Sequence, residues 1–194
     1  MQFQIKHRWT GEVRFECELS VEMETQRYSV QLGFAVRKAI DARANLTRAN
    51  LTYADLTRAN LTYANLTRAN LTRANLTAFQ QDFIAEVLTM PAELDALRAA
   101  IVAGRIDGST YSGECSCLAG TIAKAHGIDC YDGGNIGDFR AQASSPRERW
   151  FAMIKPGDTP ETNQASRMAL GWLDRAISIR DRIAIAAVAR VGAA

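Results

Sequence analysis

The chain has 194 residues, of which 47% are hydrophobic and 23% are charged, and its formal net charge is +2. This composition excludes a disordered chain and predicts one large or two small globular domains. The small net charge gives no support to sequence-specific nucleic-acid binding. The lack of about 18 consecutive apolar residues excludes a transmembrane helix, and with it a membrane partner. The first ten residues contain no apolar signal core, so we expect a cytoplasmic protein.

Residues 3 to 19 predict a β-hairpin. Apolar and polar residues alternate on both sides of Thr10-Gly11, which is typical of two strands with one apolar face. Trp9 belongs to this alternation. Together with Trp150 and Trp172, which lie on apolar helix faces, it is predicted to belong to the core.

Residues 29 to 40 follow a helical pattern, with Ser29 as a plausible cap. Beyond residue 79 the chain is again helical in pattern. Pro91 is placed at the first position of one predicted helix, and residues 145 to 148 form a capping box with proline for another. A long helix is predicted to start at Asp158.

Between these parts the sequence repeats with a period of five. Seven consecutive units follow the pattern Ala-(Asn/Asp)-Leu-Thr-X from Ala44 onward. The recurring leucines are Leu46, Leu51, Leu56, Leu61, Leu66, Leu71 and Leu76. A period of five matches neither a helix nor a strand, but self-similarity at a fixed period predicts a solenoid whose units bury their apolar residues by stacking.

This repeat resembles the pentapeptide repeat family. The resemblance implies a right-handed, square-sided β-helix with four repeats to a coil, in which leucine and alanine point inward. Seven units make slightly fewer than two coils, so the stack is only about 10 Å tall and needs caps at both ends. We expect the hairpin and the first helix to cap one end. Phe79, Phe83, Val87 and Leu88 are expected to close the other.

The predicted fold class is therefore mixed: a short right-handed quadrilateral β-helix with an N-terminal hairpin-helix cap and a C-terminal helical bundle. The expected domains are residues 1–42 for the hairpin and capping helix, 43–79 for the pentapeptide repeats, and 80–194 for the α-helical domain.

The X positions of the repeats form a candidate ligand-binding surface. Residues twenty apart should stack, which places Arg48 over Arg68 and Tyr53 beside Arg73. Most surface arginines are merely solvated, but such an Arg/Tyr surface can also hold an anionic or aromatic ligand.

A second polar cluster is predicted near Ser109 and Thr110. Its other members include Asp158, Thr159 and Asn163, for which helix capping is the alternative explanation. The candidate ligand-binding residues from the two groups are Arg48, Tyr53, Arg68, Arg73, Tyr111, Asp158, Thr159 and Asn163.

Cysteine and histidine supply the remaining candidate chemistry. Cys115, Cys117, His126 and Cys130 are the ligand types of a tetrahedral zinc site. However, the predicted helix would separate Cys117 from His126 by about 13 Å. We therefore predict free, mostly buried thiols, with no metal, no cofactor and no catalytic residue. A thiol nucleophile at a helix start stays open as an alternative. Known phosphate-loop, dinucleotide and HExxH motifs are absent from the sequence.

A second resemblance concerns origin. The opening IKHRWTGEVRF, followed by a helix and repeats, resembles small phage and prophage pentapeptide-repeat proteins. The blocks DGSTYSGECSCLAGTIA (107–123) and RWFAMIKPGDTPETN (149–163) resemble segments of phage proteins. The resemblance implies an accessory viral product in a bacterial host cell. We expect a non-enzymatic binding protein or inhibitor that counters antiviral defence by blocking a host protein or sequestering a small anionic nucleotide signal. The alternative is a small Cys- or zinc-dependent enzyme centred on Cys115 and Cys117.

The last stretch of the chain predicts an interface. Residues 183 to 191 read IAIAAVARV, which is more apolar than a free surface helix should be. We expect a homodimer with the C-terminal helices against each other. The alternative is that this helix packs back on its own chain.

Overall fold

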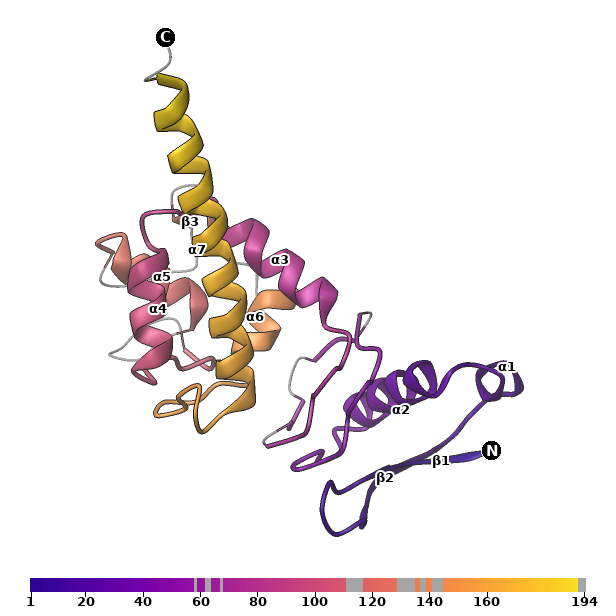
Figure 1. The fold of residues 1–194 in the computed structure, drawn as a ribbon. Helices are drawn as coiled ribbons and strands as arrows, with labels where there is room; N and C mark the ends of the chain where they lie inside the picture. Colours follow the sequence, from indigo (N-terminus) through magenta and orange to yellow (C-terminus); the bar gives the residue numbers. More distant parts are fainter. Residues whose placement is uncertain are drawn as a thin grey trace.

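The computed structural model describes residues 1–57, 59–61, 64–66, 68–110, 117–128, 135–136, 139–140 and 145–191. The helices and strands over these residues are β1 (Gln2–Lys6), β2 (Val13–Glu18), α1 (Val21–Glu24), α2 (Tyr28–Asp41), α3 (Thr77–Val87), α4 (Leu94–Val102), α5 (Leu118–Ala125), β3 (Asn135–Ile136), β4 (Phe139–Arg140), α6 (Pro146–Phe151) and α7 (Gln164–Val191). Figure 1 shows the hairpin and α2 at one end and α3 to α7 at the other, with the repeats between them.

The N-terminal hairpin is present, but its apolar alternation ends early. β1 and β2 pair antiparallel, with a register irregularity between Ile5 and Lys6. The first residue after β1, His7, is buried and forms an isolated bridge with Ala49 of the repeats. Trp9 lies in the turn beyond this bridge and is 67% exposed, so its predicted core position is wrong. Strand alternation cannot orient a residue that lies outside the strand.

Helix α2 packs directly on the repeats. Its buried face includes Leu32 and Val36, as the helical pattern predicts. Ser29 lies inside the helix rather than capping it, and its carbonyl accepts the backbone N–H of Asp55 at 2.9 Å. At Gly33 the helix comes so close that a Cβ atom would overlap the carbonyl oxygen of Asp55. Only glycine permits this approach.

The described repeat units turn the chain by the same local contacts. The Asn or Asp oxygen of the described units accepts the backbone N–H of the threonine two residues on, as Asn45 does from Thr47 at 3.0 Å. The X residue then adopts the left-handed conformation, with φ between 52° and 66°. These X residues are Arg43, Arg48, Tyr53, Arg68 and Arg73. Such Asx turns explain why the pattern requires Asn or Asp before leucine and threonine after it.

The repeats do not form the predicted β-helix. Parallel bridges join Asn45 to Asn65, Asn50 to Asn70 and Asp55 to Asn75, but each is an isolated pair. The left-handed conformation of these described X residues keeps the extended runs beside them too short to become strands. Among the described residues the fold is helix-rich, with seven helices and neither a solenoid of regular strands nor a closed sheet. The predicted fold class, a quadrilateral β-helix with a hairpin-helix cap and a helical bundle, is therefore wrong.

The leucines of the repeats are nevertheless inward, as expected. Leu46 to Leu76 are all buried at five-residue spacing, and buried alanines lie between them. Phe79 and Phe83 of α3 are also buried and belong to the same hydrophobic cluster, which runs from Phe3 to Ala176. Because this cluster is continuous, the repeats share their core with both flanking parts. The proposed domain division at 42/43 and 79/80 stays a prediction.

The helices after the repeats pack around α7. Phe83 of α3 stacks on Phe151 of α6 with ring centroids 5.6 Å apart. Trp172 of α7 lies 4.7 Å from Trp150 of α6 by the same measure. The N-cap predicted for α6 is confirmed, since the Ser145 side chain accepts the N–H of Glu148. Two helices begin later than predicted: α4 at Leu94 rather than Pro91, and α7 at Gln164 rather than Asp158.

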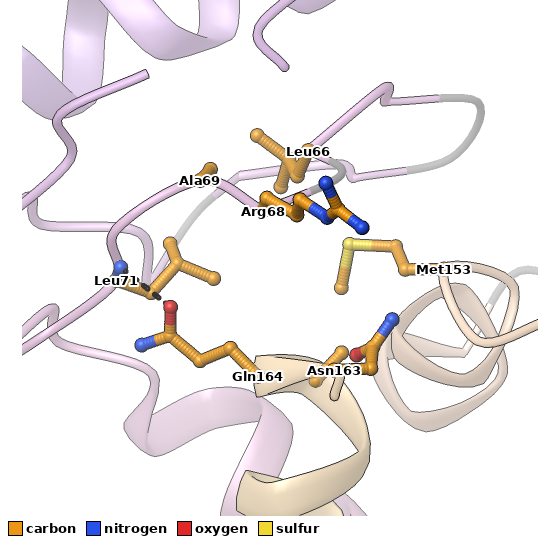
Figure 2. A pocket seen from close by; sticks show the side chains of 8 residues that line it. Leu66, Arg68, Ala69, Leu71, Met153, Asn163 and Gln164 are labelled. Carbon is orange, nitrogen blue, oxygen red and sulfur yellow. Dashed lines mark hydrogen bonds between the residues drawn. The ribbon is translucent and has the colours of Figure 1, made fainter. Parts of the chain in front are cut away.

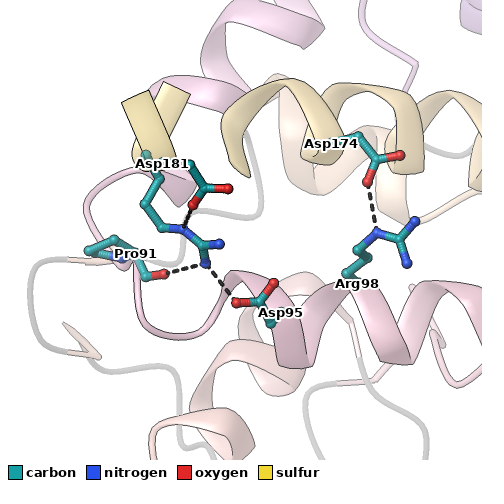
Figure 3. A network of polar contacts seen from close by, with 6 residues as sticks. Pro91, Asp95, Arg98, Asp174 and Asp181 are labelled. Atoms are coloured by element: carbon teal, nitrogen blue, oxygen red, sulfur yellow. Dashed lines mark hydrogen bonds and ion pairs between the residues drawn. The ribbon is translucent and has the colours of Figure 1, made fainter. Parts of the chain in front are cut away.

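Ion pairs hold α4 against α7, as Figure 3 shows. Arg98 contacts Asp174 at 2.8 Å, and Arg180 contacts Asp95 at 2.8 Å. The side chains of α7 from residue 182 to residue 189 are exposed, and in Figure 1 the helix extends past the other elements. The alternative that the tail packs back on its own chain is therefore wrong. No helix in the described part of the chain has the length and apolar character needed to cross a membrane.

Candidate functional site

A cleft lies between the repeats and the turn that leads into α7. It encloses about 250 Å³. Its lining residues are Thr47, Arg48, Arg68, Asp158, Thr162 and Asn163. Four of the predicted ligand-binding residues, two from the repeats and two from the later polar cluster, therefore meet in one place.

The repeat geometry brings the two arginines together. Arg48 and Arg68 occupy equivalent left-handed corners twenty residues apart. The parallel bridges between residues twenty apart stack these corners on the same side of the segment. Arg48 is half-buried and Arg68 is exposed. The Nε atom of Arg48 is buried and has no hydrogen-bond partner among the residues that the structure describes.

The opposite wall is a hydrogen-bonded turn. One carboxylate oxygen of Asp158 accepts both the backbone N–H of Lys155 at 2.9 Å and the Asn163 side-chain amide at 2.8 Å. The side-chain oxygen of Asn163 (Oδ1) accepts the N–H of Ser166 at 3.0 Å, and this hydrogen bond caps the start of α7. Thr159 does not line the cleft, and its N–H donates to the Thr162 hydroxyl. Asn163 therefore caps α7 and also lines the cleft.

Two further hollows adjoin the cleft. The first encloses about 320 Å³ and shares Thr47 with it. Its lining residues are Thr47, Ala64, Asn65, Leu66, Ala152, Met153 and Lys155. Figure 2 shows the second, which holds about 20 Å³, enough for a single water. There the Gln164 side-chain oxygen accepts the N–H of Leu71 at 3.2 Å and joins α7 to the repeats.

The other predicted repeat residues form a separate pair. The Arg73 guanidinium donates to the Tyr53 hydroxyl and lies 5.5 Å from the centre of the Tyr53 ring. Neither residue lines the cleft. Tyr111 lies outside the described residues. The structure therefore places Tyr53 and Arg73 together, as stacking predicts, but apart from Arg48 and Arg68.

The environment of Cys117 opposes nucleophilic chemistry. Burial, followed by the charge of Glu148, raises the pKa of the Cys117 thiol to about 12. A thiol with so high a pKa carries almost no thiolate at neutral pH. His126 is engaged elsewhere, since its Nδ1 atom lies 2.8 Å from the Glu93 carboxylate. Cys115 and Cys130 lie outside the described residues, and no three potential metal ligands gather within the described ranges.

A buried charged cluster between α3 and α6 was missed by the sequence reasoning. Arg147 is 4% exposed and contacts Asp82 at 3.1 Å and Glu86 at 3.3 Å. Burial raises the pKa of the neighbouring Glu148 to about 7, and the Arg147 charge opposes this rise. Asp82 and Glu86 lie four residues apart and therefore on one helix face. That spacing was the only signal in the sequence.

Comparison with known proteins identifies the repeats. Residues 42–77 match the model for pentapeptide repeats in eight copies, one more than the seven units visible by eye. The chain therefore contains a pentapeptide repeat domain. No curated protein and no solved structure matches the chain.

Proposed function

We propose that the chain is a non-enzymatic binding protein that holds a small anionic ligand of the nucleotide class in the cleft between the repeats and α7. One observation carries the proposal: Arg48 and Arg68 form one wall of this cleft, and Asp158 and Asn163 form the other. Guanidinium groups bind phosphate through charge-assisted, often bidentate hydrogen bonds.

The two walls suit different parts of a nucleotide. Arg48 and Arg68 attract phosphate oxygens, whereas the Asp158 carboxylate repels them and accepts donors such as sugar hydroxyls. A simple anion would use only half of the cleft. The cleft volume of about 250 Å³ lies just below the ordinary range for drug-sized ligands, so a mononucleotide is the fitting size.

The environment of the Cys117 thiol favours a binding role over the enzymatic alternative. A nucleophile needs a lowered pKa, whereas burial raises that of Cys117. In biological terms we propose an accessory phage product that sequesters a host nucleotide signal and so counters antiviral defence. Blocking of a host protein would serve the same end. The homodimer predicted from the apolar tail is part of this proposal, because two-fold symmetry would present two copies of the cleft.

Calorimetric titration with adenosine monophosphate tests the binding function. Replacing both Arg48 and Arg68 with alanine is expected to weaken binding by at least about tenfold, since each removes charge-assisted hydrogen bonds. Arg98→Ala is the matched control, because Arg98 is an exposed arginine on α4 that pairs with Asp174 away from the cleft. Equal affinity of the double variant and the wild type, or no binding at millimolar concentration, would contradict the proposal.

A further inference from the structure

Trp9 is the most exposed aromatic residue in the described part of the chain, at 67%. Exposing so much indole is unfavourable, because the ring is mostly apolar. The other two tryptophans follow the usual rule, with Trp150 at 0% and Trp172 at 7%. Trp9 lies beside Arg48, which lines the cleft, and this position offers an explanation for its exposure.

The turn that carries Trp9 is anchored on the repeats. The Nδ1 atom of buried His7 accepts the backbone N–H groups of Trp9 at 3.3 Å and Thr10 at 3.0 Å. The N–H of Arg8 donates to the Arg48 carbonyl at 2.9 Å. His7 also meets the indole edge-on, with ring centroids 5.8 Å apart. The backbone of Trp9 is therefore held beside Arg48.

Two guanidinium groups lie next to the indole. That of Arg8 is 3.9 Å from the centre of the ring, and that of Arg48 is 5.9 Å away. Although Arg8 lies over the ring, the side chain is still 67% exposed, so most of the indole surface is open to solvent. Arg48 is at the same time a lining residue of the cleft. The indole thus lies beside Arg48, which lines the cleft together with Arg68.

An open aromatic face beside arginines is the arrangement by which proteins hold unpaired nucleobases and their phosphates. We propose that Trp9 is the base-stacking platform for the nucleotide whose phosphate is bound by Arg48 and Arg68. This inference rests on the proposed nucleotide-binding function and adds that the base itself is recognised. Stacking tolerates any base, so the site selects nucleotides over other phosphates rather than one base over another.

The experiment compares adenosine monophosphate with ribose 5-phosphate, which lacks the base. Trp9→Ala is expected to weaken binding of the nucleotide by about tenfold to a hundredfold and to leave binding of the sugar phosphate unchanged. Trp9→Phe keeps a stacking face and should retain most of the affinity. Because Trp150 and Trp172 are buried, the fluorescence change on nucleotide binding should come from Trp9 and vanish in both variants.

The outcomes separate the two proposals. If Trp9→Ala binds the nucleotide as tightly as the wild type while the Arg48/Arg68 double variant does not, the stacking role is wrong and the cleft stands. If Trp9→Ala weakens both ligands equally, Trp9 acts through the shape of the turn, and base recognition is overturned. If the double arginine variant binds both ligands normally, the cleft itself is wrong. Since Trp9 is exposed, unchanged circular dichroism should confirm that its variants fold.

Discussion

The repeats, residues 42–76, and the helical half, α3 to α7, bury different kinds of side chain. The described core of the repeats consists of leucine and alanine alone. The core of the helical half contains large aromatics such as Trp150, and it also buries Arg147 and Glu148. In a repeat every inward residue meets its own equivalents on neighbouring units, so a charge there would meet no partner. Helices of unrelated sequence can place an acidic pair such as Asp82 and Glu86 opposite a buried arginine.

The two regions also differ in what they leave exposed. Leu61 of the repeats is 1% exposed, whereas Ile185 of the α7 tail is 69% exposed. The tail is the more continuous apolar stretch in the sequence, yet nothing in the described part of the chain covers it. Hydrophobicity alone therefore does not decide burial, and the presence of a facing surface does.

The largest expected loss of stability comes from a carboxylate in the core of the repeats, and the same change in the α7 tail is its control. Leu61→Asp would bury an unpaired charge among leucines, at a cost of about 3–5 kcal/mol, and the variant should lose soluble folded protein. Ile185→Asp makes the same change on an exposed surface and should alter the unfolding free energy of the monomer by less than about 0.5 kcal/mol. Denaturant unfolding at low protein concentration measures both. A Leu61→Asp variant of wild-type stability would contradict the inward assignment.

The same Ile185→Asp variant tests the proposed dimer. Light scattering of the wild type at micromolar concentration should give about twice the chain mass of 21.3 kDa, and the variant should give the monomer mass. A wild-type mass near one chain rules the dimer out. A dimeric variant would show that the α7 tail is not the interface.

Alanine in place of two helix glycines gives effects of opposite sign. At Gly33 the added Cβ would overlap the Asp55 carbonyl where α2 packs on the repeats, so we expect a loss of about 3 kcal/mol. At Gly171 of α7 no atom lies within 4 Å of the added carbon, so a gain of about 0.5–1 kcal/mol is expected from helix propensity. Thermal unfolding compares the two variants. A destabilised Gly171→Ala together with a neutral Gly33→Ala would overturn the packing described for α2.

A pH-dependent effect, smaller than those at Leu61 and Gly33, concerns the buried charge of the helical half. Burial raises the pKa of Glu148 to about 7, and Arg147, Asp82 and Glu86 are the charged groups that contribute. The folded state therefore holds a proton that the unfolded chain releases near its ordinary pKa of about 4.3. This contribution to stability is fully present below that value and is lost as the pH rises through 7.

Glu148→Gln removes this titration. Wild-type stability should fall between pH 5 and pH 8 by on the order of 2 kcal/mol relative to the variant, as measured by unfolding at each pH. Glu161→Gln, at an exposed position, is the matched control and should follow the wild type. Parallel curves for Glu148→Gln and the wild type would show that Glu148 is already ionised at pH 5.

Much of the local structure follows from the sequence alone. Recurrence of leucine every five residues predicted the buried positions, and recurrence every twenty predicted the contact between Tyr53 and Arg73. The Ser145-Pro146 cap was equally readable. These features depend on residues close in the sequence or on equivalent residues of neighbouring repeats. The sequence pattern therefore shows which residues contact each other. The prediction of regular β-helix strands was wrong because left-handed corners at the described X residues, such as Arg48 and Arg68, interrupt the extended backbone.

The candidate site was only half predictable. Sequence reasoning named Arg48, Arg68, Asp158 and Asn163, but in two unrelated groups, and only the folded chain brings them to one cleft. The exposure of Trp9 was decided in the same way, because His7 and Arg8 anchor the turn on the repeats beyond the end of β1. Periodicity records which face of an element is apolar, whereas contacts between elements far apart in the chain decide what each face meets.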